Sequence, residues 1–265
     1  MWVAGATRAM TDEARAWWNA WADEFQDNDI GVAVAFGPGA PVGDDLGLLG
    51  DVEGTRAIEL GCGGGQFGLA LADRGADVTG VDLSEAQLAH ARENANERDA
   101  DVDFVETSVT DLDAFADAAF ELAFSAFAFQ WVADLDAAFA EAYRVLEPGG
   151  RLVYSVDHPF YKTVDPDTHR VEGSYFEDDP RRVHSESFDA EMVIYSRGIG
   201  DTVSRLTDAG FQVEAVREPG YADPGAYQND FGSFEPDLMA KVPPTVVYAA
   251  RKPEREAGAT ASGTR

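Results

Sequence analysis

The stretch between residues 57 and 84 constrains the fold of this chain most strongly. It begins Ala-Ile-Glu-Leu-Gly-Cys-Gly-Gly-Gly-Gln-Phe-Gly, and its last seven residues are Val-Thr-Gly-Val-Asp-Leu-Ser. The apolar run at 57–60 predicts a strand, and the glycines after it predict a tight turn. A helix over 67–74 and a second strand over 77–81 follow, so the sequence predicts an α/β nucleotide cradle.

The residue types at the turn indicate what the cradle holds. Gly61, Gly63 and Gly65 can adopt positive φ and lack a Cβ, so a ligand can lie against the backbone. The helix behind them presents free N–H groups and the positive end of its dipole. Asp82 follows the first glycine by about 20 residues, the offset at which a carboxylate binds ribose hydroxyls. The expected ligand therefore carries a nucleoside, although a tight turn without a ligand is the alternative.

These residues match the sequence motifs of two protein families. The glycine loop at 61–65 and Gly-Val-Asp-Leu-Ser at 80–84 resemble motif I and the following strand end of class I S-adenosylmethionine (SAM) dependent methyltransferases. The sequence Leu-x-Pro-Gly-Gly-x-Leu at 146–152 is also typical of that family. Read as Gly-x-Gly-x-x-Gly at 63–68, the same glycines match the dinucleotide fingerprint. The alternatives are an NAD-dependent oxidoreductase and a SAM-binding protein without catalysis.

The methyltransferase resemblance implies a fold, a cofactor and a set of site residues. The fold is a Rossmann-like, doubly wound, seven-stranded sheet with the last strand antiparallel and helices on both faces. SAM is the cofactor, and methyl transfer is an in-line displacement aided by proximity and desolvation. The resemblance does not identify the acceptor, and the acidic composition favours a small molecule. The cofactor-binding residues implied by the resemblance are Glu59, Gly61, Cys62, Gly63, Gly65, Asp82, Leu83, Ser108, Val109, Ser125 and Trp131. Ser108 stands where the family usually has an acid near adenine, and Asp111 is the alternative for that role.

The chain divides into a core and flanking segments. Residues 55–252 form the expected SAM-binding domain, 1–54 an N-terminal helix and linker, and 253–265 a polar tail. Further strands are expected at 102–106, 120–125, 151–156, 211–217 and 245–251. Further helices are expected at 85–97, with Ser84 as N-cap, at 134–146 and at 197–209.

The N-terminal helix is expected to begin at an N-cap, Thr11, and to run to Gln26, because residues 1–10 carry little pattern. Its aromatic residues, Trp17, Trp18, Trp21 and Phe25, recur at spacings of three and four and form one stripe. The stripe is either a packing face or a lid and wall of the substrate pocket.

A segment of weak periodicity over residues 157–196 follows the fifth expected strand. Because it leaves the carboxyl end of a strand in a doubly wound sheet, we expect it to cap the substrate crevice. His158, Asp157 and Tyr161 are the candidate catalytic residues there, with His158 as a general base. The alternative for His158 is a structural role at the strand end, and acceptors that arrive ionised need no base.

Composition limits the partners and the compartment. The chain carries 49 acids against 20 bases, a net charge of −29, which disfavours nucleic acid and anionic membranes as partners. This acidity indicates adaptation to a salt-rich cytoplasm, or simply an acidic soluble protein. A single cysteine, Cys62, permits no intrachain disulfide, and the four histidines lack zinc spacing, so no metal is expected. No secretory signal or membrane-spanning run is apparent, and the oligomeric state is left open.

Overall fold

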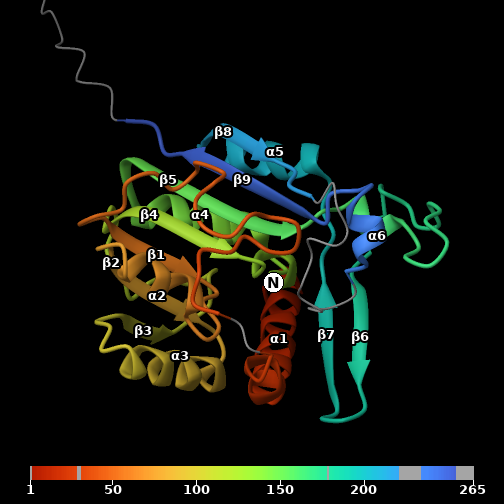
Figure 1. The fold of residues 1–265 in the computed structure, drawn as a ribbon, viewed down its shortest axis with the longest axis horizontal. Helices are drawn as coiled ribbons and strands as arrows, with labels where there is room; N and C mark the ends of the chain where they lie inside the picture. The colour runs from red at the N-terminus through yellow and green to blue at the C-terminus, as the bar shows by residue number, and fades with distance from the viewer. Residues whose placement is uncertain (1, 29–30, 178, 221–233, 255–265) are drawn as a thin grey trace, which may run out of the picture.

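The protein is built on one mixed β-sheet with the strand order β3-β2-β1-β4-β5-β9-β8 (Figure 1). The computed structural model describes residues 2–28, 31–177, 179–220 and 234–254. The strands are β1 (Arg56–Leu60), β2 (Asp77–Asp82), β3 (Asp103–Glu106), β4 (Phe120–Ala126), β5 (Leu146–Asp157), β8 (Gln212–Arg217) and β9 (Thr245–Arg251). Strands β1 to β5 pair in parallel, and β9 lies antiparallel between β5 and β8. The predicted seven-stranded Rossmann-like fold is confirmed.

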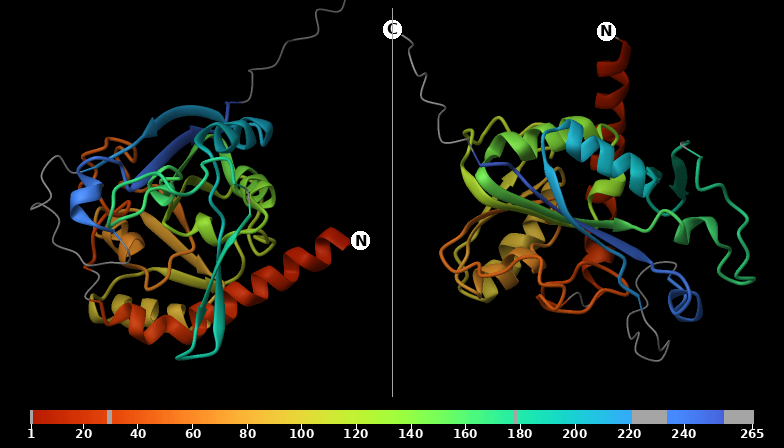
Figure 2. Two further views of the ribbon diagram at one scale, coloured as in Figure 1. Left: turned by 90° about the vertical axis from the view of Figure 1, so that its right-hand side faces the viewer. Right: turned by 90° about the horizontal axis from the view of Figure 1, so that it is seen from above.

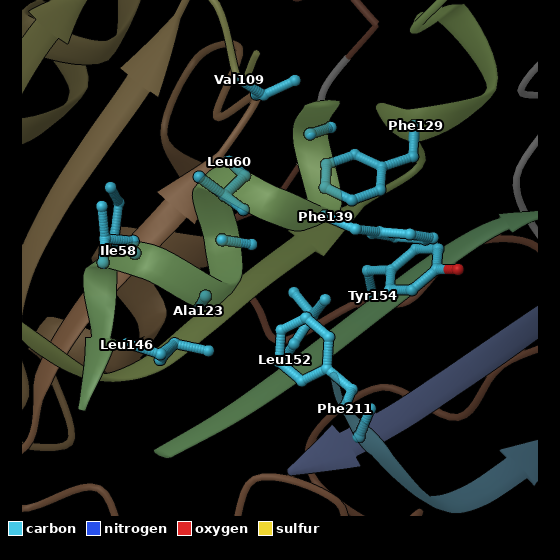
Figure 3. Close-up of a cluster of buried hydrophobic side chains, with 14 of the residues drawn as sticks. Ile58, Leu60, Val109, Ala123, Phe129, Phe139, Leu146, Leu152, Tyr154 and Phe211 are labelled. Atoms are coloured by element: carbon cyan, nitrogen blue, oxygen red, sulfur yellow. The ribbon is translucent and has the colours of Figure 1, made fainter. Parts of the chain in front are cut away.

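Successive side chains of each strand point to opposite faces of the sheet, and they contribute to two apolar cores, one on each face. On β1, Ile58 and Leu60 join the core beneath α4 (Leu135–Val145) and α5 (Ile199–Asp208). Figure 3 shows that core, in which aromatic and aliphatic side chains from the helices and the sheet meet. Ala57 faces the other core, beneath α2 (Gln66–Ala72) and the loop that precedes β1. Helices therefore cover both faces, as expected.

The N-terminal helix α1 (Trp2–Gln26) lies beside the sheet, against α3 (Glu85–Glu97) and a hairpin (Figures 1 and 2). The hairpin consists of β6 (Arg181–Ser185) and β7 (Ala190–Ile194), paired antiparallel inside the expected cap. Short elements complete the described part of the chain: η1 (Phe129–Trp131), η2 (Tyr161–Thr163) and α6 (Pro236–Met239).

Two predicted boundaries are wrong. The first helix begins at Trp2, so Thr11 lies in its interior and is not an N-cap. The stretch before Thr11 is rich in helix formers and holds no proline, so nothing in it stops the helix.

Strand β5 begins at Leu146, not at residue 151, and includes the Pro-Gly-Gly turn. Gly149 N–H donates to the carbonyl of Lys252 at 2.9 Å, and Lys252 N–H donates to the carbonyl of Gly150 at 2.8 Å. These bonds extend the sheet through the turn, where Gly149 has φ of 87°.

The β6–β7 hairpin was not predicted as an element of the cap. Strand β6 is largely exposed, so the apolar alternation that marks a half-buried strand is weak in its sequence. No helix in the described ranges is long and apolar enough to cross a membrane. Most of the tail expected at 253–265 lies outside the described residues.

Candidate functional site

A cavity of about 190 Å³ opens at the carboxyl ends of β1, β2 and β4. Carboxyl ends of parallel strands are where ligands bind in doubly wound sheets. The glycine turn after β1 and the end of β2 form one half, and α1, the loop before β1 and the segment after β4 form the other. Among the described residues, the charged and amide side chains of the lining, Glu59, Gln66, Asp82 and Gln87, come from β1, α2, β2 and α3, whereas α1, the loop before β1 and the segment after β4 contribute apolar residues.

The glycine turn brings backbone close to the cavity. Gly61 and Cys62 donate their N–H groups to the carbonyl of Val81, which ties the turn to β2. Gly61 has φ of 74°, and a Cβ there would lie 2.4 Å from the Cβ of Ala128. Gly63 has φ of 52°, and among the described residues a Cβ there would meet only the side chain of Gln87, at 3.6 Å. The turn therefore needs glycine for conformation at both positions and for space at Gly61.

Asp82 ends β2 with its carboxylate at the cavity wall. Its Oδ2 accepts from Gly63 N–H at 2.9 Å, and its Oδ1 accepts from Ser84 N–H at 2.9 Å. Burial raises the pKa of Asp82, and these backbone N–H groups oppose that rise. A carboxylate has about four acceptor positions, so Asp82 keeps acceptor capacity for a pair of ribose hydroxyls.

Glu59 lies on β1 beneath the turn and is almost fully buried. Its Oε2 accepts from Gly68 N–H in the first turn of α2 at 2.8 Å. Burial holds the pKa of Glu59 well above its usual value, with Asp82 adding to the rise. Burial likewise raises the pKa of the neighbouring Cys62 thiol, which keeps it protonated at neutral pH.

The apolar half of the cavity is lined by aromatic and small side chains. Trp18 from α1 meets Trp131 from η1 edge to face, with ring centroids 4.6 Å apart. Phe25 and Phe127 also line this half. Trp17 points instead to the hairpin, with its ring 4.9 Å from Phe188. The aromatic stripe of α1 therefore packs against the hairpin with one edge and lines the cavity with another, and its role as a lid or substrate-pocket wall stays a prediction.

The structure sorts the predicted cofactor residues into two groups. Those that line the cavity are Glu59, Gly61, Cys62, Gly63, Asp82, Leu83, Val109 and Trp131. Gly65, Ser108 and Ser125 do not line it. Gly65 N–H closes the turn on the carbonyl of Cys62, Ser108 bonds to Thr110, and the Ser125 hydroxyl donates to the carbonyl of Leu60.

The candidate base lies outside the cavity lining. His158 is buried, and its Nε2 lies 2.8 Å from Oε1 of Glu218. Its Nδ1 accepts from Phe160 N–H at 3.2 Å, so Nε2 carries the proton of the neutral ring. Asp157 pairs with Lys162 at 3.0 Å.

Tyr161 is equally engaged away from the cavity. Its hydroxyl accepts from Glu235 N–H at 2.9 Å, and burial raises its pKa. Each of the three candidate catalytic side chains therefore has a partner within the cap and its neighbours. Their catalytic role stays a prediction.

Two polar residues of the described lining were not predicted. Gln66 and Gln87 line the cavity, and both bond through Gln26 of α1. The signal for Gln66 is its position as the first residue of the helix after the glycine turn. Gln87 gives no comparable signal, because its place follows from how α3 packs.

These donors and acceptors fit SAM. Asp82 can hold the ribose hydroxyls, the glycine turn leaves room for the amino acid portion, and the Glu59 carboxyl lies beside that turn. An aromatic face such as that of Trp131 is favourable beside a sulfonium cation. The fold also differs from the usual dinucleotide-binding sheet, which is mostly parallel, because β9 is antiparallel here.

Comparisons with known proteins agree with this geometry. The family described as "Methyltransferase domain" matches residues 58–154. The uncharacterized methyltransferase YbaJ of Bacillus subtilis is 30% identical over 189 residues, covering 68% of this chain and 72% of that protein. A solved SAM-dependent methyltransferase from Mesorhizobium loti superimposes with a TM-score of 0.58 at 26% identity, covering 78% of this chain and 94% of that one.

Other relatives match over the cofactor-binding part alone. Demethylmenaquinone methyltransferase of Thermus thermophilus is 43% identical over 100 residues, 37% of this chain and 45% of that protein. The chain thus spans less than half the length of the first curated relatives that it matches, 45% and 43%. Their similarity bears on the cradle and not on the segments that would select an acceptor.

Proposed function

The chain belongs to the SAM-dependent methyltransferases, and from this premise we propose that it moves a methyl group from SAM to a small-molecule acceptor. The observation that carries the proposal is the Asp82 carboxylate, fixed by the N–H groups of Gly63 and Ser84 at the cavity wall. This arrangement presents acceptors for a ribose beside a glycine turn that admits the rest of the cofactor.

Bound SAM supplies a methyl group on a positively charged sulfur, an electrophile that needs no covalent help from the protein. The residues of the chain contribute binding and exclusion of water. Asp82 and Glu59 hold the cofactor, while Trp18, Phe127 and Trp131 keep the opposite half of the cavity apolar. Holding a nucleophile in line in a water-poor site is the main source of rate.

The acceptor that this lining supports is a small apolar or aromatic molecule. The net charge of −29 opposes nucleic acid as a substrate. The cap at 157–196 and α1, acting as a lid, are the segments that we expect to select the acceptor.

His158 remains our candidate general base, with Asp157 and Tyr161 next to it in the chain. A base matters where the acceptor must lose a proton during attack. For His158 to act, its ring must leave Glu218 and turn toward the acceptor. His158→Asn should then lower kcat and leave SAM affinity unchanged, and an unaltered kcat would remove His158 from the mechanism.

Calorimetric titration tests the proposal directly. We expect SAM and S-adenosylhomocysteine to bind, and NAD and NADP not to bind, at molar KCl. Asp82→Ala should weaken SAM binding by about 1 to 3 kcal/mol, the scale of a lost charge-assisted hydrogen bond. Binding of NAD alone would replace the methyltransferase with an oxidoreductase. Tight SAM binding without turnover over a broad acceptor panel would favour a non-catalytic SAM-binding protein.

We also infer that the protein works in a salt-rich cytoplasm. The net charge of −29 makes the folded chain repel itself in dilute buffer, and molar salt shortens the Debye length to about 3 Å. The midpoint of thermal unfolding should therefore rise steeply as KCl is raised toward molar concentration. A midpoint that stays level across this range would contradict salt adaptation.

A further inference from the structure

A polar stripe on α1 contacts the segment that runs from the end of β2 into α3, which contributes Leu83 and Gln87 to the cavity lining. We define the stripe as Arg15, Asn19, Asp23 and Gln26, which recur at spacings of four, four and three and so share one face of the helix. Arg15 Nε donates to the carbonyl of Leu83 at 3.2 Å, and Asp23 contacts His90 of α3 at 2.8 Å. The stripe therefore follows the chain onward from the end of β2.

Asn19 sits at the point where this chain segment turns into α3. Its Oδ1 accepts from the Ser84 hydroxyl at 2.8 Å and from Ala86 N–H at 3.2 Å. Ser84 is fully buried, and its N–H donates to Oδ1 of Asp82. Its hydroxyl also accepts from Gln87 N–H at 3.1 Å as the N-cap of α3. A side chain of α1 thereby fixes the residue that orients the Asp82 carboxylate.

Gln26, at the end of α1, binds both amide side chains of the cavity. It donates from Nε2 to Oε1 of Gln87 at 2.6 Å and accepts from Nε2 of Gln66 at 2.5 Å. Its side chain also covers Gly64, where a Cβ would lie 2.4 Å from Oε1 of Gln26. The glycine turn is thus held from outside by α1.

The same helix carries Trp18 into the apolar half of the cavity, against Trp131. One rigid helix therefore joins the ribose corner, the glycine turn and the aromatic wall. A change in how α1 docks must alter all three, because a helix moves as a unit.

We propose that Asn19 and Gln26 are positioning residues of the cofactor site, through which cofactor binding and the docking of α1 over the cavity become one coupled equilibrium. The inference rests on the proposed function, since the coupled ligand is SAM or S-adenosylhomocysteine. Coupling is reciprocal, so the stripe strengthens cofactor binding to the degree that cofactor strengthens docking. Neither side chain needs to touch the cofactor.

The test replaces Asn19 in two ways. Asn19→Leu removes both accepted hydrogen bonds, whereas Asn19→Asp keeps acceptor oxygens for Ser84 and Ala86. We expect Asn19→Leu to weaken S-adenosylhomocysteine binding by about 5- to 20-fold in calorimetry, within the usual range of coupling between sites. Asn19→Asp should bind like the wild type. Asn96→Leu, at an exposed asparagine of α3, is the matched control and should also bind like the wild type.

A second variant and a second measurement separate coupling from simple loss of fold. Gln26→Met should also weaken the binding of S-adenosylhomocysteine. Thermal unfolding should show that each variant is folded. Addition of S-adenosylhomocysteine should slow hydrogen exchange of the amides in residues 10–26 of the wild type and have much less effect in Asn19→Leu. A purely structural role would leave that ligand dependence unchanged.

The outcomes distinguish this inference from the function beneath it. If the wild type binds neither SAM nor S-adenosylhomocysteine, both fall together. If the wild type binds and Asn19→Leu and Gln26→Met bind equally well, the coupling alone is wrong. Equal weakening by Asn19→Asp and Asn19→Leu would also overturn it, because the accepted hydrogen bonds would then not matter.

Discussion

The substitution Glu59→Gln should stabilise the protein at neutral pH. Glu59 is 3% exposed, and burial holds its pKa well above the usual 4.5. A glutamine can still accept from Gly68 N–H, so the hydrogen bond at 2.8 Å is kept while the buried charge is removed. The desolvation cost recovered is about 1 to 3 kcal/mol, which raises Tm by roughly 2 to 12 °C in a protein of this size.

The sign of the pH dependence follows from proton binding. Between pH 4.5 and the raised pKa, native Glu59 binds more protons than the unfolded chain, so the free energy of unfolding falls as pH rises. Above the native pKa the whole cost applies, and below 4.5 the carboxyl is neutral in both states. The advantage of the variant should therefore be largest near pH 8 and vanish as the pH approaches 4.5.

The assay compares thermal unfolding of the variant and the wild type from pH 5 to pH 8 at fixed KCl. Glu93→Gln, at an exposed position of α3, removes the same charge without the burial and should give a difference near zero throughout. A Glu59→Gln variant that is less stable than the wild type at pH 8 would refute the reasoning. An advantage of constant size at every pH would refute it equally, because proton binding would then not be its cause.

Two further substitutions test how the site is held. Gly61→Ala should cost at least about 1 kcal/mol more than Gly54→Ala in thermal unfolding, because both have positive φ but only the Cβ at Gly61 would strike Ala128. Arg197→Met should cost about 1 to 3 kcal/mol, because Arg197 Nη2 bonds the carbonyls of Val132 and Ala133 beside the cavity, at 2.6 and 3.2 Å.

The control for Arg197 is Arg205→Met. Arg205 pairs with Asp136 and Asp201 at the surface, where ion pairs contribute about 1 kcal/mol or less. Equal losses at Arg197 and Arg205 would contradict a special role for the carbonyl bonds. Equal losses in the two glycine variants would mean that the contact with Ala128 relaxes at no cost.

The core of the fold and the cradle formed by the glycine turn and Asp82 could be predicted from local sequence. The strand, turn and helix around Gly61 and Gly63 follow from apolar runs, positive φ and spacing, which act between neighbours in the chain. The position of Asp82 follows likewise, because the end of β2 must lie beside the end of β1 in a parallel pair. The antiparallel last strand followed from a family resemblance and not from periodicity.

Tertiary structure alone decided which side chains surround that cradle. Spacing aligned Trp17 and Trp18 on one stripe, but only packing sent one toward Phe188 and the other into the cavity. Gln87 lines the cavity because α3 docks beside it. Ser108 bonds to Thr110 and does not line the cavity.

Asn19 shows the reason most plainly. Its partners Ser84 and Ala86 lie more than sixty residues away in the chain, at separations of 65 and 67. Local patterns report forces that act within a turn of helix or along one strand. Contacts across such separations form only when a whole helix is placed against the sheet. The sequence by itself therefore determined the cradle of glycine turn and Asp82, and only the tertiary structure decided which side chains surround it.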